Sequence, residues 1–189
     1  MGKDYSKARM SFFRAPISNK FPECEVSLFQ VYRYVVGFEA QSRTICLRGI
    51  TDEKKQREFK GWQLDYVTPS GTFSYCNDDG LKEHSGIICI DLDDIADVED
   101  LFQKLLSDPY FETLLLFRSP RGCGLKWFVP IDLEKCDHKT WFSAIRNYLM
   151  KTYGLSEKQV DPACANVSRA CWLCHDAQAY LKTELYEYY

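Results

Sequence analysis

The sequence predicts an α+β fold: an antiparallel sheet with helices on one face, preceded by an irregular N-terminal α/β segment. Strand-like and helix-like periodicities alternate in the C-terminal half, and glycine-containing turn signals separate them. The chain has 189 residues, of which 46% are hydrophobic and 15% aromatic, enough for one buried core. No apolar run approaches the roughly 18 residues of a membrane-spanning helix, so we expect no membrane association.

The chain is expected to form a single domain over residues 1–189. The turn signal Asn77–Gly80 is the only candidate internal boundary, dividing an N-terminal subregion, 1–80, from a regular core, 81–180. The polar start, Met1 to Met10, lacks the apolar stretch of a secretory signal, so we expect a cytoplasmic protein. The aromatic end, Leu185 to Tyr189, suits a position inside a longer protein as well as a natural terminus.

Hydrophobic patterns predict the elements of the N-terminal subregion. A charged surface helix is expected over Thr51–Lys60, because charge runs are usually a solvated helix face. The other expected elements are a strand at Met10–Ile17, an apolar helix or strand at Val26–Val36, and strand-like residues at Leu64–Tyr75 interrupted by Thr68–Gly71.

The core reads as strand, helix, strand, strand, helix, strand. This order is the split βαβ arrangement of ferredoxin-like and RNA-recognition-type domains, and it leaves the helix-free face of the sheet open for chemistry. The expected strands are Gly86–Asp93, Thr113–Arg118, Leu125–Ile131 and Ala170–His175, and the helices span Val98–Leu106 and Trp141–Thr152, with Gly154 ending the second.

Two carboxylates at the end of the first core strand are the sharpest chemical feature. Because side chains alternate along a strand, Asp91 and Asp93 share one face. Like charges this close are stable mainly beside a cation, and Mg²⁺ or Mn²⁺ suits oxygen ligands. The alternative is a solvated strand end at which Asp94 caps the following helix, the role that we assign to Asp94.

The hairpin between the second and third core strands is a candidate phosphate-binding loop. Gly122 and Gly124 let backbone N–H groups approach an anion, and polar or cationic contacts come from Ser119, Arg121 and Lys126. It is not a Walker A loop, because it lacks the required spacing and the following helix. The alternative is an ordinary glycine turn with exposed basic residues.

A third motif precedes the last expected strand. Asp161 could supply a further carboxylate to the metal site, and Arg169 could bind a phosphate through two hydrogen bonds. The alternatives are a plain Asp-Pro turn and a surface ion pair.

These motifs, in this order, resemble the archaeo-eukaryotic primase and primase-polymerase (AEP) superfamily, whose pattern is a strand ending in D-x-D or D-x-E, then S-x-H, then a hydrophobic residue and Asp. The resemblance is closest to the VirE-associated N-terminal domains of bacterial mobile elements. It runs through Thr68–Phe73, His84–Gly86, Asp91–Asp93 and Ser119–Lys126, and covers about residues 10–180. One departure is Lys126, where the wider superfamily has histidine; lysine supplies the charge but not the imidazole's geometry or proton exchange.

The resemblance implies a function in replication of a mobile element or phage. Asp91, Asp93 and Asp161 would bind Mg²⁺ or Mn²⁺, and Ser119 and Arg169 would contact phosphate. A primer 3′-hydroxyl would attack the α-phosphate of a nucleoside triphosphate on a single-stranded DNA or RNA template. The family context also implies a helicase-like ATPase partner.

Two other functions fit the same residues. One is a non-catalytic nucleic-acid-binding module that keeps a degenerate primase fold; the other is a metal-dependent nuclease or nicking domain. The net charge of −3 means that any contact with nucleic acid is local or bridged by metal. A pure binder has no need of three carboxylates, and a nuclease would act without added nucleotide.

Cysteine and aromatic residues give weaker signals. We expect most of the nine cysteines to be buried thiols, because their number is odd and their spacing irregular. Covalent haem at Cys171–His175 is rejected, and a zinc site formed with Cys164, Cys171 and Cys174 is disfavoured because strand alternation separates the last two. Trp127 is a candidate base-stacking residue but reads better as core, and His84 reads as a turn residue hydrogen-bonded to backbone.

Overall fold

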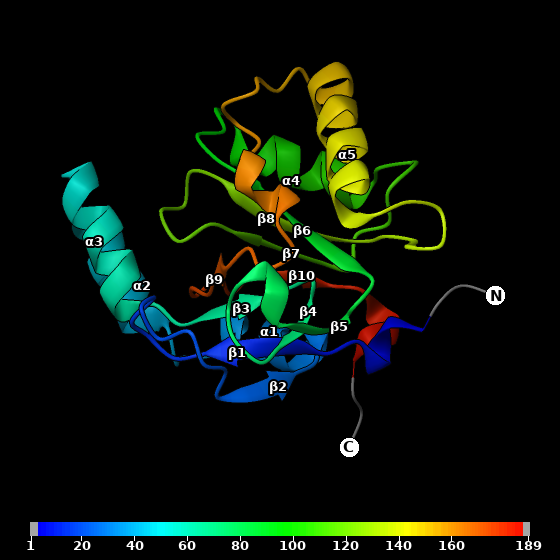
Figure 1. Cartoon of the computed structure of the whole chain (residues 1–189). Helices are drawn as coiled ribbons and strands as arrows, with labels where there is room; N and C mark the ends of the chain where they lie inside the picture. The colour runs from blue at the N-terminus through cyan, green and yellow to red at the C-terminus, as the bar shows by residue number, and fades with distance from the viewer. Residues whose placement is uncertain (1–3, 187–189) are drawn as a thin grey trace.

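A computed structural model describes residues 4–186, which form two four-stranded antiparallel sheets and a two-stranded hairpin (Figure 1). The expectations for Met1 to Met10 and for Leu185 to Tyr189 fall in part on residues 1–3 and 187–189, which lie outside the described residues. In the described range, no helix combines the length and apolarity needed to cross a membrane.

The core sheet contains the expected split βαβ unit. Strands β6 (Ile87–Leu92) and β7 (Leu115–Arg118) both pair antiparallel with β8 (Leu125–Pro130), so they run parallel to each other with β8 between them. Helix α4 (Val98–Leu106) connects them, and β10 (Tyr180–Leu181) adds to the outer edge of β7. The α+β fold class predicted from the sequence is therefore confirmed.

The N-terminal subregion forms the second sheet, in the order β2-β1-β3-β9. Three helices that precede β3 accompany it, and a short hairpin, β4 with β5, follows β3 (Figure 1). The bounds are β1 (Met10–Phe13), β2 (Cys24–Val26), α1 (Leu28–Val36), α2 (Gln41–Gly49), α3 (Glu53–Gln63), β3 (Tyr66–Thr68), β4 (Gly71–Phe73) and β5 (Leu81–His84). The sequence patterns did not predict β2, α2 or β5.

The last predicted strand lies in the wrong sheet. Only Cys171–Trp172 (β9) is extended, and it pairs with β3 of the N-terminal sheet through Tyr66↔Trp172 and Val67↔Cys171. The place beside β6 is taken by residues 159–161, which bond to β6 through a single bridge, Leu92↔Val160, and two adjacent backbone hydrogen bonds. A two-residue strand carries no periodicity that could specify its partner.

One face of the core sheet packs on α4 and α5 (His138–Tyr153), as expected. Trp127 is fully buried there and donates its indole N–H to Thr113 Oγ1 at 2.8 Å, so it is a core residue and not a stacking platform. Buried strand side chains on this face are Ile88, Ile90, Leu92, Leu116, Leu125 and Val129.

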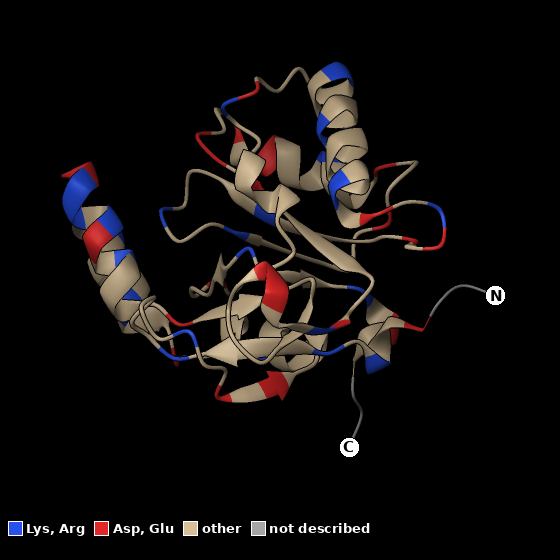
Figure 2. Cartoon of the chain, viewed as in Figure 1, with Lys and Arg blue, Asp and Glu red and all other residues tan. Residues whose placement is uncertain are grey.

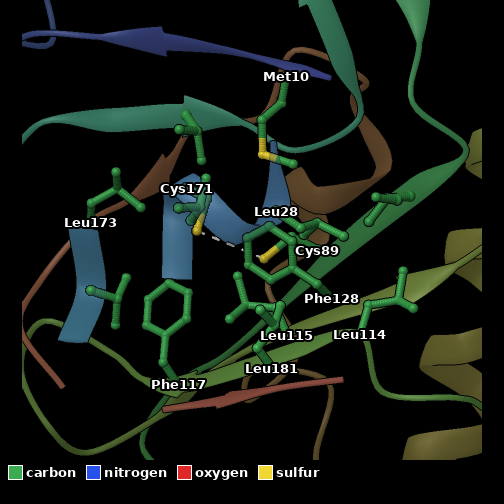
Figure 3. Close-up of a cluster of buried hydrophobic side chains, with 14 of the residues drawn as sticks. Met10, Leu28, Cys89, Leu114, Leu115, Phe117, Phe128, Cys171, Leu173 and Leu181 are labelled. Carbon is green, nitrogen blue, oxygen red and sulfur yellow. Dashed lines mark hydrogen bonds between the residues drawn. The ribbon is translucent and has the colours of Figure 1, made fainter. Parts of the chain in front are cut away.

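The opposite face is not open, contrary to the prediction. It packs on α1 and the N-terminal sheet in one hydrophobic cluster that includes Met10, Leu28, Phe117 and Phe128 (Figure 3). A solvent-exposed Phe or Leu cluster of this size would be unfavourable, so the N-terminal elements cover it. Only the polar end of this face, beyond Cys89, remains for chemistry.

Local capping corrects one assignment. Helix α4 starts at Val98, and Asp97 caps it by accepting a hydrogen bond from the Asp100 amide. Asp94, expected to be the cap, instead adopts a left-handed conformation with φ of 52° in the loop before the helix. At the other end of the core, Gly154 ends α5 with φ of 70°, as predicted.

Fewer cysteines are buried than expected. All nine are free thiols, but only Cys89, Cys164, Cys171 and Cys174 are buried. The buried four lie between or beside the two sheets, and Cys89 Sγ is 3.8 Å from Cys171 Sγ (Figure 3). Strand pattern alone did not separate these four from the surface thiols, because single cysteines occur in both settings.

Replacing Gly124 with alanine tests how tightly the hairpin is packed. A Cβ at Gly124 would lie 2.0 Å from the Leu92 carbonyl oxygen, so backbone must shift. We expect Gly124→Ala to lower the free energy of unfolding in urea by about 1–3 kcal/mol. Gly49→Ala is the matched control: nothing lies within 4 Å of its Cβ, so the change should be neutral or slightly stabilising. Equal effects of the two substitutions would contradict the packing at Leu92.

Candidate functional site

Strand alternation and register bring Asp91 together with Lys126. Along β6, Cys89 and Asp91 point towards the N-terminal sheet, whereas Ile88 and Ile90 point towards α4 and α5. The antiparallel register places Lys126 of β8 directly opposite Asp91. The two motifs, 35 positions apart in the sequence, therefore meet as a cross-strand pair.

Asp91 and Lys126 form a buried ion pair. The side chains are 10% and 4% exposed, and Lys126 Nζ contacts Asp91 Oδ2. Burial alone would lower the pKa of Lys126, but the Asp91 carboxylate outweighs it and raises the pKa above its ordinary value. Lys126 is therefore a charged ammonium held inside the protein.

Two buried polar atoms beside this pair lack a hydrogen-bond partner among the described residues. One is an acceptor, Asp91 Oδ1, and the other is a donor, Arg169 Nε. Both residues line a small hollow between the two sheets, together with Lys126, Ser70 and Cys164. We call it the inner hollow. Unpaired buried polar groups are costly, so a donor and an acceptor left free in one hollow suit a polar ligand or water.

Residues 159–161 bring the third motif to the same place. The Asp161 amide donates to the Asp91 carbonyl oxygen at 3.0 Å, which fixes the segment beside β6. Asp161 Oδ2 accepts a hydrogen bond from Arg169, and Oδ1 accepts from the Ala163 amide at 2.9 Å, capping the 3₁₀ turn η3 (Pro162–Ala165). Both Asp161 oxygens thus already have partners. Arg169, and not Asp161, is the charged residue of this motif that lines the inner hollow.

Asp93 lies on the outer side of the pair, in a second cleft. Its side chain is 37% exposed and lies 3.5 Å from Arg121 Nη2. Burial, and then the charge of Asp91, raise the pKa of Asp93, while Lys126, Arg121 and Lys60 oppose this shift. We call this the outer cleft; its walls include basic Arg57, Lys60, Arg121 and Lys158 and acidic Glu53, Asp93 and Asp94.

The glycine hairpin is closed on itself. The Gly122 N–H donates to the Ser119 carbonyl oxygen and the Ser119 N–H donates to the Gly124 carbonyl oxygen, both at 2.8 Å. Ser119 is 3% exposed, and Arg48 of α2 donates to its carbonyl oxygen. Lys126 lines the inner hollow and Arg121 lines the outer cleft, whereas Ser119, Gly122 and Gly124 line neither of them.

Comparison with known proteins identifies a family. The family model of the BT4734-like N-terminal domain matches residues 60–181, well over half of the chain and all three motifs. The chain belongs to this family. No curated protein and no solved structure matches this BT4734-like domain.

Among the described residues, the carboxylates of this BT4734-like domain do not form a closed metal cage. Within residues 4–186, no group of three or more His, Cys, Asp or Glu side chains is arranged to hold a metal ion. The unpartnered Asp91 Oδ1 is nevertheless a suitable oxygen ligand. Mg²⁺ is usually held by only one or two protein carboxylates, with water and substrate phosphates completing its shell. The residues therefore fit a cation shared with a phosphate ligand better than a closed three-carboxylate cage.

The cysteines of the expected zinc position have other partners. Cys174 Sγ donates to the Arg118 carbonyl oxygen at 3.2 Å, and Cys171 Sγ is in contact with Cys89 Sγ. Burial raises the pKa of the Cys164 thiol to about 12, which disfavours the thiolate that zinc requires.

Histidines of the BT4734-like domain form a chain of hydrogen bonds behind the inner hollow. The Gly86 N–H donates to His84 Nδ1, so His84 Nε2 carries the proton and faces His138 Nδ1 at 3.2 Å. His138 Nε2 then donates to the Cys164 carbonyl oxygen at 3.0 Å. The backbone bond predicted for His84 is present, but His138 was missed, because its sequence context is that of an ordinary helix start.

Lys60 is the other residue that sequence reasoning missed. It was assigned to a solvated helix face, whereas it is half-buried at the foot of α3 and lines the outer cleft. The sequence signal that could have indicated this is its position at the end of the charge run, directly before Gly61 and Trp62, where the charged segment gives way to less polar residues.

Replacing Lys126 with methionine tests the buried ion pair. Lys126→Met leaves the Asp91 carboxylate buried without its partner, so we expect the free energy of unfolding in urea to fall by about 3–5 kcal/mol. The double variant Asp91→Asn, Lys126→Met should recover part of that loss. Lys104→Met is the control, since its surface pair with Asp100 should contribute less than about 0.5 kcal/mol. A single-variant loss no larger than that of the control would refute the pair.

The pH dependence of stability tests the histidine chain. Burial lowers the pKa of His138 below 6.5, so the unfolded state binds the proton first. The stabilising contribution is complete above pH 6.5 and is lost as the pH falls from there through the lower pKa of the folded state. We expect the fall in unfolding free energy between about pH 7.5 and about pH 5 to be smaller in His138→Gln than in the wild type. An unchanged pH profile in His138→Gln would exclude His138 as its source.

Proposed function

We propose that this domain is a primase-polymerase-like nucleotidyltransferase of the VirE-associated, AEP-like kind, acting on single-stranded nucleic acid in the replication of a mobile element or phage. The observation that carries the proposal is the convergence of Asp91, Lys126 and Arg169 on one hollow from three separated motifs. Buried ionic groups are rare unless paired or functional, and here two polar atoms stay unpaired.

The basic groups suit the phosphates of a nucleoside triphosphate. Arg169 has a free, buried Nε and can donate to a phosphate oxygen beside its contact with Asp161. Lys126 contacts Asp91, and Arg121 lies beside Asp93. The two cations would balance the charge of the bound triphosphate. Lysine at position 126 acts as a point charge and is already charged through its contact with Asp91.

The carboxylates suit a divalent cation bound together with that triphosphate. Asp91 would hold Mg²⁺ or Mn²⁺ through Oδ1, and Asp93, one residue beyond the end of β6, would face the bound triphosphate from the outer cleft. When bound, such an ion supplies Lewis-acid activation of a 3′-hydroxyl and of the leaving pyrophosphate. Asp161 would contribute by holding Arg169 in place, since both of its oxygens have protein partners.

Template and partner are part of the same proposal. A single-stranded DNA or RNA template would need aromatic stacking surfaces, and exposed aromatic side chains are available at Trp62, Phe38 and Tyr110, whereas Trp127 is buried. A helicase-like ATPase would supply the strand, as the resemblance implies, and the reaction would take place in the cytoplasm.

A second candidate function is a non-catalytic nucleotide-binding or nucleic-acid-binding module. The pairing of Asp91 with Lys126 and of Asp161 with Arg169 favours it, because each carboxylate already has a basic neighbour. Such a module would bind nucleotide or single strands but would not extend a primer.

Calorimetric titration of dATP and ATP in the presence of Mn²⁺ tests the nucleotide site. We expect Asp93→Asn, and the double variant Asp91→Asn, Asp93→Asn, to weaken metal-dependent binding by at least about tenfold, a loss of about 1.4 kcal/mol. Glu134→Gln, an exposed carboxylate outside both hollows, is the matched control. Thermal unfolding of each variant checks that it remains folded.

The outcomes separate the candidate functions. Metal-dependent binding lost in the Asp93 variant, followed by primer extension by the wild type, supports the nucleotidyltransferase. Binding without extension supports the non-catalytic module. Degradation of single strands without added nucleotide supports a nuclease, and the absence of nucleotide binding in the wild type refutes the proposed function.

A further inference from the structure

The outer cleft lies between helix α3 and the end of the core sheet. In Figure 1, α3 stands apart from the rest of the fold, and Figure 2 shows basic and acidic residues along it. The C-terminal end of the helix is anchored: the Ile17 N–H donates to the Gly61 carbonyl oxygen at 2.7 Å, and Arg43 Nη1 donates to the Gln63 carbonyl oxygen at 2.8 Å. Lys60 is therefore held at the fixed end of α3, in the same cleft as Asp93 and Asp94, which follow β6.

Most charges of the outer cleft are paired. Arg57 pairs with Glu53 of its own helix, and Arg121 pairs with Asp94 at 3.1 Å and with Asp93 at 3.5 Å. Among the described residues, Lys60 and Lys158 have no carboxylate within ion-pair distance. Lys158 is exposed to solvent, whereas Lys60 is half-buried, so its ammonium is the uncompensated charge of the cleft.

Three cations from three elements converge near Asp93. They are Lys60 from α3, Arg121 from the glycine hairpin and Lys126 from β8. Burial, and next the charges of Lys126 and Arg121, lower the pKa of Lys60, while Asp93 and Asp91 act in the opposite direction. Since Lys126 is paired with Asp91 and Arg121 with Asp93 and Asp94, Lys60 is the member of this group whose charge an anion in the cleft would neutralise.

We propose that the outer cleft binds the polyphosphate tail of a nucleotide, with Lys60 as a phosphate contact supplied by the N-terminal helix. This inference rests on the proposed function and extends its site beyond the three motifs. The tail would run from the inner hollow past Asp93 to Lys60 and Arg121.

The mixture of charges favours a metal-bound polyphosphate over a nucleic-acid backbone. The cleft presents Arg57, Lys60, Arg121 and Lys158, but also Glu53, Asp93 and Asp94. Strand-binding grooves are predominantly basic, because every nucleotide adds a negative charge. A polyphosphate bound with Mg²⁺ or Mn²⁺ presents both signs, and it suits basic and acidic side chains together.

Titration with sodium tripolyphosphate and with dATP, each with Mn²⁺, tests the inference. We expect Lys60→Ala to weaken both by at least about tenfold, and Lys60→Arg to retain much of the affinity. Lys54→Ala is the matched control, since Lys54 is an exposed lysine of the same helix outside the cleft, and its titrations should match the wild type. Unfolding measurements confirm that the variants are folded.

The results distinguish this inference from the proposed function. If dATP binds to the wild type and to Lys60→Ala equally, the inference is overturned and the nucleotide site stands. If tripolyphosphate binds through Lys60 but dATP does not bind with Mn²⁺, the phosphate contact of Lys60 is supported, whereas the nucleotide, and with it the proposed function, is refuted. If Lys60→Ala weakens binding of a single-stranded oligonucleotide but not of tripolyphosphate, the cleft is a strand path and the inference is overturned.

Discussion

The ion pair between Asp91 and Lys126 determines how the rest of this site is built. Two charges this deeply buried are tolerated because each neutralises the other, and the register of β6 against β8 sets them opposite one another. Around the pair, residues 159–161 close the sheet edge, Arg169 enters from one side, and Arg121 and Lys60 lie on the other. A shift of β6 by one residue against β8 would turn the Asp91 side chain into the apolar layer beneath α4 and α5 and leave Lys126 without its partner.

Polarity changes steadily along the inner face of β6. Ile87 and Cys89 are part of the hydrophobic cluster between the sheets, Asp91 is buried but ionic, and Asp93, just beyond the strand, is partly exposed. This gradient explains how a face that is covered by the N-terminal sheet still reaches solvent at one end. The chemistry is confined to that end, and the apolar remainder holds the two sheets together.

Much of the core could be predicted because its elements are long enough to show a period. The β6 and β8 strands, α4 and α5 follow their hydrophobic patterns, and Gly154 ends α5 where a left-handed residue is favoured. Alternation along β6 predicted that Asp91 points away from the apolar layer beneath α4 and α5, whereas Asp93 lies beyond the strand and lines the outer cleft. The pairing of strands could not be predicted in the same way, because β9 has only two residues and the pairing of Lys126 with Asp91 depends on a register that no local pattern encodes. Lys60 and His138 were missed for the same reason, because their neighbours come from distant parts of the chain. Helix α2 was missed because few of its side chains are buried.

The pairing of β3 with β9 also constrains how the protein is made. Val67 and Cys171 are partners although most of the chain lies between them, so the N-terminal sheet acquires its last strand only after the core has been synthesised. Contacts this distant in sequence slow folding, since a long loop must close before they form. On the ribosome, residues 1–80 would wait with the β3 edge unpaired and the apolar face of α1 uncovered, a state that chaperones recognise.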